Sequence, residues 1–155
     1  KVDYKTGEVL KNVDLEPKYF GEGLSILNNK IYQLTWKNQK GFVYDLATFT
    51  LEKEFSYEGE GWGLTTDGQS LILSDGPHQL RFLDPVTFKV TRTVNVLRDG
   101  QPLRLLNELE FIRGEIYANI WQSHTVRYFE VSKRWMVAFQ CITQLVCSVL
   151  GLSRR

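Results

Sequence analysis

Apolar and polar residues alternate in short runs over residues 1–132. A period of two residues is typical of β-strands with one buried face, and this region shows no sustained helical period. In the first clear unit the runs lie at about residues 24–27, 30–36, 41–45 and 50–56. Turn residues such as Asn28-Asn29 separate them, and later units carry Asp67-Gly68 and Arg113-Gly114 at the same place. The pattern therefore predicts successive four-stranded units joined by tight turns.

These units repeat along the chain. The segments "VDYKTGEVLKNV" (2–13), "YDLATFTLEKEF" (44–55) and "LDPVTFKVTRTV" (83–94) share an apolar residue, an Asp, a Thr and a turn. The first-strand leucines Leu24, Leu64 and Leu109 are spaced by 40 and 45 residues. Four short strands every ~40–45 residues are typical of a β-propeller. An all-β sandwich with accidental spacing is the alternative.

The repeat boundaries predict an all-β chain that forms part of a propeller over residues 1–132. We expect 1–16 to be the outer hairpin of a preceding blade, 17–57 and 58–97 to be blades, and 98–131 to be an incomplete blade. A propeller with fewer than four blades does not close. The chain, which opens in the middle of the pattern, is therefore expected to be a truncated or processed form with open blade faces.

Residues 133–155 differ from this body. They carry four basic and no acidic residues, which leaves 15 basic and 18 acidic residues in 1–132, a net charge of −3. The run from Trp135 to Leu152 is long enough for a membrane helix, but its polar residues weaken that interpretation. A short amphipathic helix or a non-native end are the alternatives. Cys141 and Cys147, the two cysteines, fit neither a zinc spacing nor a disulfide framework.

Aligning the units reveals a slot that could carry chemistry. The position two residues before the first-strand leucine holds Glu22, Trp62 and Asn107. Because the first strand of each propeller blade lines the central axis, we expect these three side chains to face one shared pocket. A second slot, fourteen residues after the first, holds Trp36 and Trp121.

The residue types in these slots suit one small substrate terminus that carries an amine and a carbonyl. A carboxylate partly desolvated by indoles has a raised pKa and can carry a proton in both directions near neutral pH. An Asn amide can donate to a carbonyl oxygen that gains charge, and Trp rings form a rigid apolar wall. No metal or other cofactor is required, and His78 and His124 lie in unrelated contexts.

Structural interpretations remain open for the same residues. Trp36 and Trp121 could pack blades together, and Glu22 could be a turn residue. Three other carboxylates compete with Glu22 for the acidic role: Glu60, Glu108 and Glu110. The overall charge of +1 gives no indication of nucleic-acid binding.

At these motifs the chain resembles the plant-type glutaminyl-peptide cyclotransferase family. The resemblance covers about residues 1–131 and rests on "FGEGL" (20–24), "IYQLTW" (31–36), "GEGWGLTTDG" (59–68), "LSDG" (73–76), "LNELE" (106–110) and "IYANIW" (116–121). It implies a five-bladed β-propeller. It also implies conversion of the N-terminal glutamine of peptides or proteins to pyroglutamate with release of ammonia, without a cofactor.

Carried over by motif, the resemblance implies catalytic roles for Glu22, as the acid/base carboxylate, and Asn107, as the carbonyl-binding amide. It implies substrate-binding roles for Phe20, Trp36, Trp62 and Trp121. The family also places a lysine and first-blade residues around the pocket, from segments that this chain lacks. The resemblance therefore leaves open whether the chain alone is active, even if its parent is an enzyme.

The resemblance further implies a location in the secretory pathway, the vacuole or the extracellular space. The printed sequence contains no signal-peptide pattern and no N-glycosylation sequon, so localisation rests on the resemblance only. Two other functions compete with the enzyme. One is a non-catalytic propeller fragment that binds a peptide or glycan, and the other is a fragment that associates with a membrane through residues 135–152.

Overall fold

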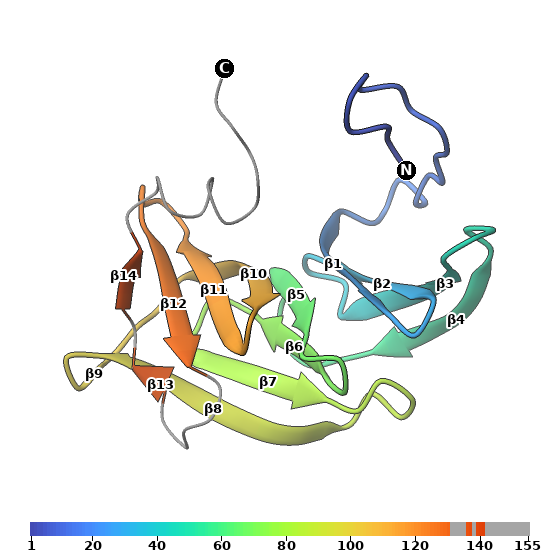
Figure 1. Cartoon of the computed structure of the whole chain (residues 1–155). Helices are drawn as coiled ribbons and strands as arrows, with labels where there is room; N and C mark the ends of the chain where they lie inside the picture. Colours follow the sequence, from blue (N-terminus) through green and yellow to red (C-terminus); the bar gives the residue numbers. More distant parts are fainter. Residues whose placement is uncertain (131–135, 138, 142–155) are drawn as a thin grey trace.

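The protein forms three sheets, as a computed structural model of residues 1–130, 136–137 and 139–141 shows (Figure 1). The described residues contain strands and no helix. In the first sheet the strands follow one another in chain order: β1 (Gly21–Leu27), β2 (Lys30–Thr35), β3 (Lys40–Asp45) and β4 (Leu51–Ser56). The prediction of an all-β chain built from repeated four-stranded units is confirmed.

The second sheet repeats this meander. Its strands are β5 (Gly63–Thr66), β6 (Leu71–Ser74), β7 (Gln79–Leu83) and β8 (Val90–Arg98). Two short strands extend it at β8: β9 (Gln101–Pro102) pairs antiparallel and β13 (Met136–Val137) pairs parallel. The third sheet has the order β10 (Leu106–Ile112), β11 (Glu115–Ile120), β12 (Val126–Glu130) and β14 (Phe139–Cys141).

Strand β14 lies beyond the predicted end of the third unit at residue 131. It pairs antiparallel with β12, in the register Val126 to Cys141, and so supplies a fourth strand from the region expected to be a divergent tail. An outer strand leaves a row of unpaired N–H and C=O groups that another extended segment can satisfy. The described tail residues are therefore strands, not the helix considered for them. The rest of 133–155 lies outside the described residues.

The membrane interpretation of the tail concerns residues 135–152, most of which lie outside the described residues. No helix in the described part of the chain is long and apolar enough to cross a membrane.

An aspartate turn occurs in the N-terminal segment and is repeated before β4 and before β8. The Asp Oδ1 accepts hydrogen bonds from the N–H groups two and three residues on: Lys5 and Thr6 for Asp3, Ala47 and Thr48 for Asp45, Val86 and Thr87 for Asp84. These hydrogen bonds, that of the Thr first, lower the pKa of each Asp carboxyl. Where a first hairpin was expected, the segments that flank the Asp3 turn are joined by an isolated β-bridge between Val2 and Val9 and by hydrogen bonds from the Asp3 and Leu10 N–H groups to the Glu8 and Lys1 carbonyls.

The hydrophobic core lies between neighbouring sheets and consists of separate clusters. Successive side chains of β6 point alternately into two of these clusters. Leu71 and Leu73 are fully buried in a cluster shared with the first sheet, while Ile72 is fully buried in a cluster shared with the third. Because successive side chains point to opposite faces of a strand, one buried strand can serve both clusters. The second sheet is thus packed on both faces.

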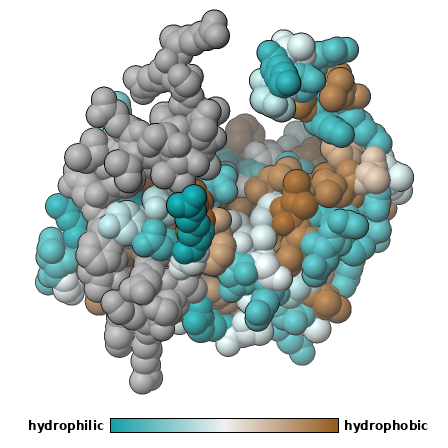
Figure 2. Space-filling view, viewed as in Figure 1, coloured by the Kyte–Doolittle hydropathy of each residue, from teal (hydrophilic) through white to brown (hydrophobic). Residues whose placement is uncertain are grey.

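The outer face of the first sheet is less covered. Leu24 and Ile26 on β1 are 50% and 51% exposed. Figure 2 shows apolar residues gathered over this sheet, below the N-terminal segment. This open blade face agrees with the expectation from a partial ring.

The innermost strands of the three sheets lie beside one another at the centre (Figure 1), with β5 between β1 and β10. The Gly23 N–H donates to the Trp62 carbonyl at 3.1 Å, and the Phe111 N–H donates to Thr65 Oγ1 at 3.0 Å. Glycine makes this approach possible. A Cβ added at Gly63 would lie 2.2 Å from the Asn107 carbonyl oxygen, and one added at Gly23 would lie 2.6 Å from the Leu64 nitrogen.

Candidate active site

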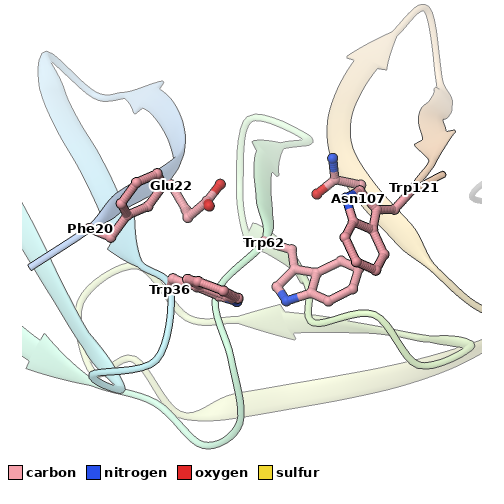
Figure 3. A pocket seen from close by; sticks show the side chains of 6 residues that line it. All are labelled: Phe20, Glu22, Trp36, Trp62, Asn107 and Trp121. Carbon is pink, nitrogen blue, oxygen red and sulfur yellow. The ribbon is translucent and has the colours of Figure 1, made fainter.

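All six residues singled out in the sequence line one pocket of about 250 Å³. The lining consists of Phe20, Glu22, Trp36, Trp62, Asn107 and Trp121 (Figure 3). They come from three sheets, which are brought together only by the ring-like arrangement. The Glu22 carboxylate and the Asn107 amide reach into the same opening from opposite sides (Figure 3).

Glu22 and Asn107 occupy equivalent irregularities in their strands. The β1–β2 register shifts between Gly21 and Leu24, and the β10–β11 register shifts between Leu106 and Leu109. Such bulges bend a strand and re-aim a side chain, and they are common next to active sites. The same local distortion therefore turns the carboxylate and the amide toward one opening.

A relay of hydrogen bonds holds two of the three slot positions, Trp62 and Asn107, together. The Trp62 N–H donates to the Ser74 carbonyl at 3.1 Å, and the Ser74 hydroxyl donates to the Asn107 carbonyl at 2.6 Å. The same hydroxyl accepts from the Gly63 N–H at 3.0 Å. Since Ser74 is fully buried, water does not compete for these hydrogen bonds, and the relay fixes the spacing between β5 and β10.

The two residues of the second slot, Trp36 and Trp121, also occupy equivalent positions in the structure. Trp36 and Trp121 follow directly after β2 and β11, and their backbone N–H groups donate to the Phe20 and Leu105 carbonyls, each at 2.9 Å. The equivalent place in the second sheet is Gly76, whose φ is 91°. A Cβ there would lie 2.9 Å from the Trp62 ring. The missing third indole of this slot is explained, because Trp62 fills the space.

The aromatic side chains form two edge-to-face pairs. The ring centroids of Phe20 and Trp36 are 6.1 Å apart at an interplanar angle of 66°, and those of Trp62 and Trp121 are 5.5 Å apart at 68°. Both arrangements are of the favourable T-shaped kind. Phe20, Trp36 and Trp121 remain 63%, 39% and 48% exposed, so much of the aromatic wall faces the open pocket.

Glu60, a rival carboxylate in the sequence, lies behind this wall. Its Oε2 accepts hydrogen bonds from Trp36 Nε1 at 2.7 Å and Trp62 Nε1 at 2.8 Å. The Trp62 hydrogen bond, followed by that of Trp36 and the positive charge of Lys37, holds the pKa of the Glu60 carboxyl below its ordinary value against a smaller effect of burial. This carboxylate is therefore ionised and engaged with the indoles.

The two carboxyl groups nearest the axis have raised pKa values. Burial raises the pKa of Glu22, the direction expected from its indole neighbours. Burial, and then the charge of Glu22, raise the pKa of Glu108 to about 7. Since the Glu108 side chain is exposed, water screens part of both effects, and we take about 7 as an upper limit.

Glu108 was not among the predicted site residues. Its position beside Asn107 was visible in the sequence, but the alternation of β10 assigns adjacent residues to opposite faces. The described residues contain no group of three or more His, Cys, Asp or Glu that could hold a metal ion.

The site is thus a pocket in a propeller-like fold, lined by an acid, an amide and three indoles. The chain belongs to the glutamine cyclotransferase family, whose family model matches residues 1–139. It is 43% identical over 127 residues to a glutaminyl-peptide cyclotransferase of Arabidopsis thaliana, an alignment that covers 81% of this chain and 40% of that protein.

Solved structures agree with this assignment. The structure of the glutaminyl cyclase of Myxococcus xanthus matches with a TM-score of 0.75 and 34% identity, over 90% of this chain and 60% of that one. The WD40 domain of Pan2 from Neurospora crassa matches with a TM-score of 0.56 at 10% identity, over 88% of this chain and 58% of that domain, which is a likeness of fold alone. The chain thus spans between 40% and 60% of the length of its two family relatives.

Proposed function

We propose that the protein acts as a glutaminyl-peptide cyclotransferase, which converts the N-terminal glutamine of a peptide or protein to pyroglutamate and releases ammonia. The observation that supports this most is the convergence of Glu22, Asn107 and the aromatic residues on one pocket. The names of the Arabidopsis and Myxococcus relatives agree with it. The pocket is small and suits one residue at a peptide terminus.

The reaction needs only groups that the pocket holds. The α-amine nitrogen attacks the γ-carbonyl carbon of the same residue, a C–N bond forms, and a five-membered ring closes. The bond between that carbon and the amide nitrogen then breaks, and ammonia leaves. Because both reacting atoms belong to one residue, holding the folded-back conformer supplies a large part of the rate enhancement. The aromatic wall is suited to hold that conformer.

Glu22 and Asn107 would assist the two charge-separating steps. In this proposal the Glu22 carboxylate takes a proton from the attacking amine and delivers it to the departing nitrogen. The raised pKa of Glu22 suits this role, because it brings the pKa of the carboxyl closer to the pKa values of the attacking amine and the departing nitrogen. The Asn107 side-chain amide donates a hydrogen bond to the carbonyl oxygen as it gains charge.

A turnover assay tests the proposal. The chain is incubated with a peptide that begins with glutamine, and released ammonia and the lactam product are measured; the N-acetylated peptide has no nucleophile and serves as a blank. Glu22→Gln should lower turnover by roughly 10²-fold or more. Glu58→Gln, a change at an exposed carboxylate two residues from Glu60, should leave turnover unchanged. Wild-type turnover no faster than the uncatalysed rate, or full activity in Glu22→Gln, would contradict the proposal.

A further inference from the structure

We propose that Glu60 is a positioning residue for the pocket: its carboxylate links the two halves of the aromatic wall and fixes the distance between them. The kinetic part of this inference rests on the proposed cyclotransferase function, whereas its structural part does not. Glu60 itself does not line the pocket. It would act on the reaction only through the indoles that it holds.

The link is a single oxygen atom shared by two sheets. Glu60 Oε2 accepts from Trp36 Nε1 at 2.7 Å and from Trp62 Nε1 at 2.8 Å. Figure 3 shows the two indole nitrogens turned toward each other along one side of the pocket, where this acceptor lies. Trp36 follows the first sheet and Trp62 precedes the second. The carboxylate therefore joins side chains that no strand pairing connects.

The shared acceptor also joins the two aromatic pairs into one unit. Phe20 packs on Trp36, and Trp121 packs on Trp62. Without Glu60, the Phe20–Trp36 pair would be held by the first sheet and the Trp62–Trp121 pair by the second and third. The opening between the pairs would then be set by loop positions. With it, four rings contributed by three sheets share one anchor. A pocket that must hold a folded-back conformer requires such a fixed opening.

The anchor is itself rigidly held. The Gly61 N–H donates to the Trp36 carbonyl at 2.9 Å, and Arg81 Nη1 donates to the Glu58 carbonyl at 2.6 Å. Arg81 Nη2 also pairs with Asp75 at 2.8 Å, and this ion pair is largely buried. A loop tied on both sides of Glu60 places its carboxylate before any substrate arrives. The indole donors are thus met by a prearranged acceptor.

The negative charge of Glu60 strengthens its hydrogen bonds with the Trp36 and Trp62 indoles. Hydrogen bonds to an ionised acceptor are roughly twice as strong as neutral ones, and Glu60 is held ionised by its donors. Lys37 Nζ lies 4.0 Å from the centroid of the Trp36 ring, so a cation covers the same indole. Trp36 is thus fixed at its edge by Glu60 and at its face by Lys37, although it remains partly exposed.

Nuclear magnetic resonance of the indole N–H groups tests the structural part. The ¹H–¹⁵N signals of Trp36 and Trp62 are assigned with Trp36→Phe and Trp62→Phe variants of the full chain. In Glu60→Ala both signals should move upfield, because each loses a charge-assisted hydrogen bond. Glu60→Gln keeps an acceptor oxygen and should show smaller shifts, and Glu58→Gln should show none. Unmoved Trp36 and Trp62 signals in Glu60→Ala would overturn the proposal.

Kinetics tests the functional part. In Glu60→Ala kcat should fall by roughly 10- to 100-fold with a smaller change in KM, because the rings still offer apolar contact but no longer hold the reactive conformer. Glu60→Gln should recover part of kcat. Shifted indole signals with unchanged kcat in an active enzyme would overturn the positioning role. A wild-type chain without turnover would instead refute the proposed function, while the indole spectrum would still decide whether Glu60 links the two rings.

Discussion

The Ser74 hydroxyl donates a hydrogen bond to the Asn107 backbone carbonyl, 2.6 Å away, and so ties the second sheet to the residue proposed to bind the substrate carbonyl. Ser74 and Asn107 are 33 residues apart in the chain, and neither strand pairing nor the hydrophobic core connects their groups directly. The position of Asn107 therefore depends on a buried hydroxyl outside the pocket.

Replacing Ser74 by Ala should both destabilise the fold and disturb the pocket. The change leaves the Gly63 N–H and the Asn107 carbonyl without their buried partner, and an unsatisfied buried group costs about 1–3 kcal/mol. We expect the free energy of unfolding, measured with urea, to fall by about this amount and kcat/KM to fall with it. Ser56→Ala, at an exposed serine of β4, is the control. Equal stability of the two variants would contradict the role of Ser74.

Gly76 offers a test of how tightly Trp62 is packed. In Gly76→Ala the new methyl group meets the Trp62 ring at 2.9 Å, and the residue must also keep a φ of 91°. Gly68→Ala is a matched control, since Gly68 has a φ of 89° and nothing within 4 Å of an added Cβ. The control should lose on the order of 1 kcal/mol of unfolding free energy through backbone strain.

Gly76→Ala should lose more than this control and should also change the tryptophan fluorescence of the native state, because the indole must move. Equal losses in the two variants, with identical native spectra, would show that the Trp62 ring is not confined by Gly76.

The charge of Glu108 predicts a pH-dependent stability. Its pKa is raised in the folded state, from an ordinary value of 4.5 to at most about 7, so folding disfavours the ionised form. Below pH 4.5 the carboxyl is largely protonated in both states and Glu108→Gln should have little effect. As the pH rises through the folded pKa the wild type loses stability that the variant retains. Thermal unfolding should therefore show a higher Tm for Glu108→Gln above pH 7.

The same experiment in a Glu22→Gln background separates the causes. Part of the shift of Glu108 arises from the charge of Glu22, so removing that charge should shrink the stabilising effect of Glu108→Gln. An effect on Tm that was equal at all pH values would contradict the raised pKa of Glu108.

The acid limb of the pH–rate profile should report Glu22. The proposed mechanism needs both the neutral α-amine of the substrate, whose pKa is about 8, and the ionised form of Glu22. As the pH drops, kcat/KM should therefore fall in two steps, the lower one at the pKa of Glu22. Burial raises that pKa above its ordinary value of 4.5, and the lower step should lie correspondingly higher. A lower step at or below pH 4.5 would show that another group controls the reaction.

Five of the six pocket residues could be predicted because they obey the repeat, whereas Phe20 was implied only by the family resemblance. Glu22, Trp62 and Asn107 occupy one slot in successive units, and the ring-like arrangement converts equal position in the repeat into proximity in space. Glu60 could not be assigned by this reasoning. It lies in the connection before β5, and only the paths of two side chains decide that its carboxylate meets both indoles. Its closeness to Trp62 in sequence was the only signal.

The outer edges of the units were predicted less well. Strand β14 was missed because the segment before it lacks the Asp and Thr that mark the corresponding turns of the other units. Pairing with the open edge of β12 depends on backbone groups, which carry no sequence signal of their own. For the same reason the single bridge at Val2 and Val9 could not be distinguished from a longer hairpin.

The most direct test of the account is a crystal structure of the chain with a peptide that begins with pyroglutamate, the proposed product. The account predicts the lactam ring between the indoles of Trp36 and Trp121, its carbonyl oxygen accepting from the Asn107 amide and its N–H facing the Glu22 carboxylate. A lactam ring bound outside this pocket, or bound in it with the carbonyl turned away from Asn107, would contradict the account.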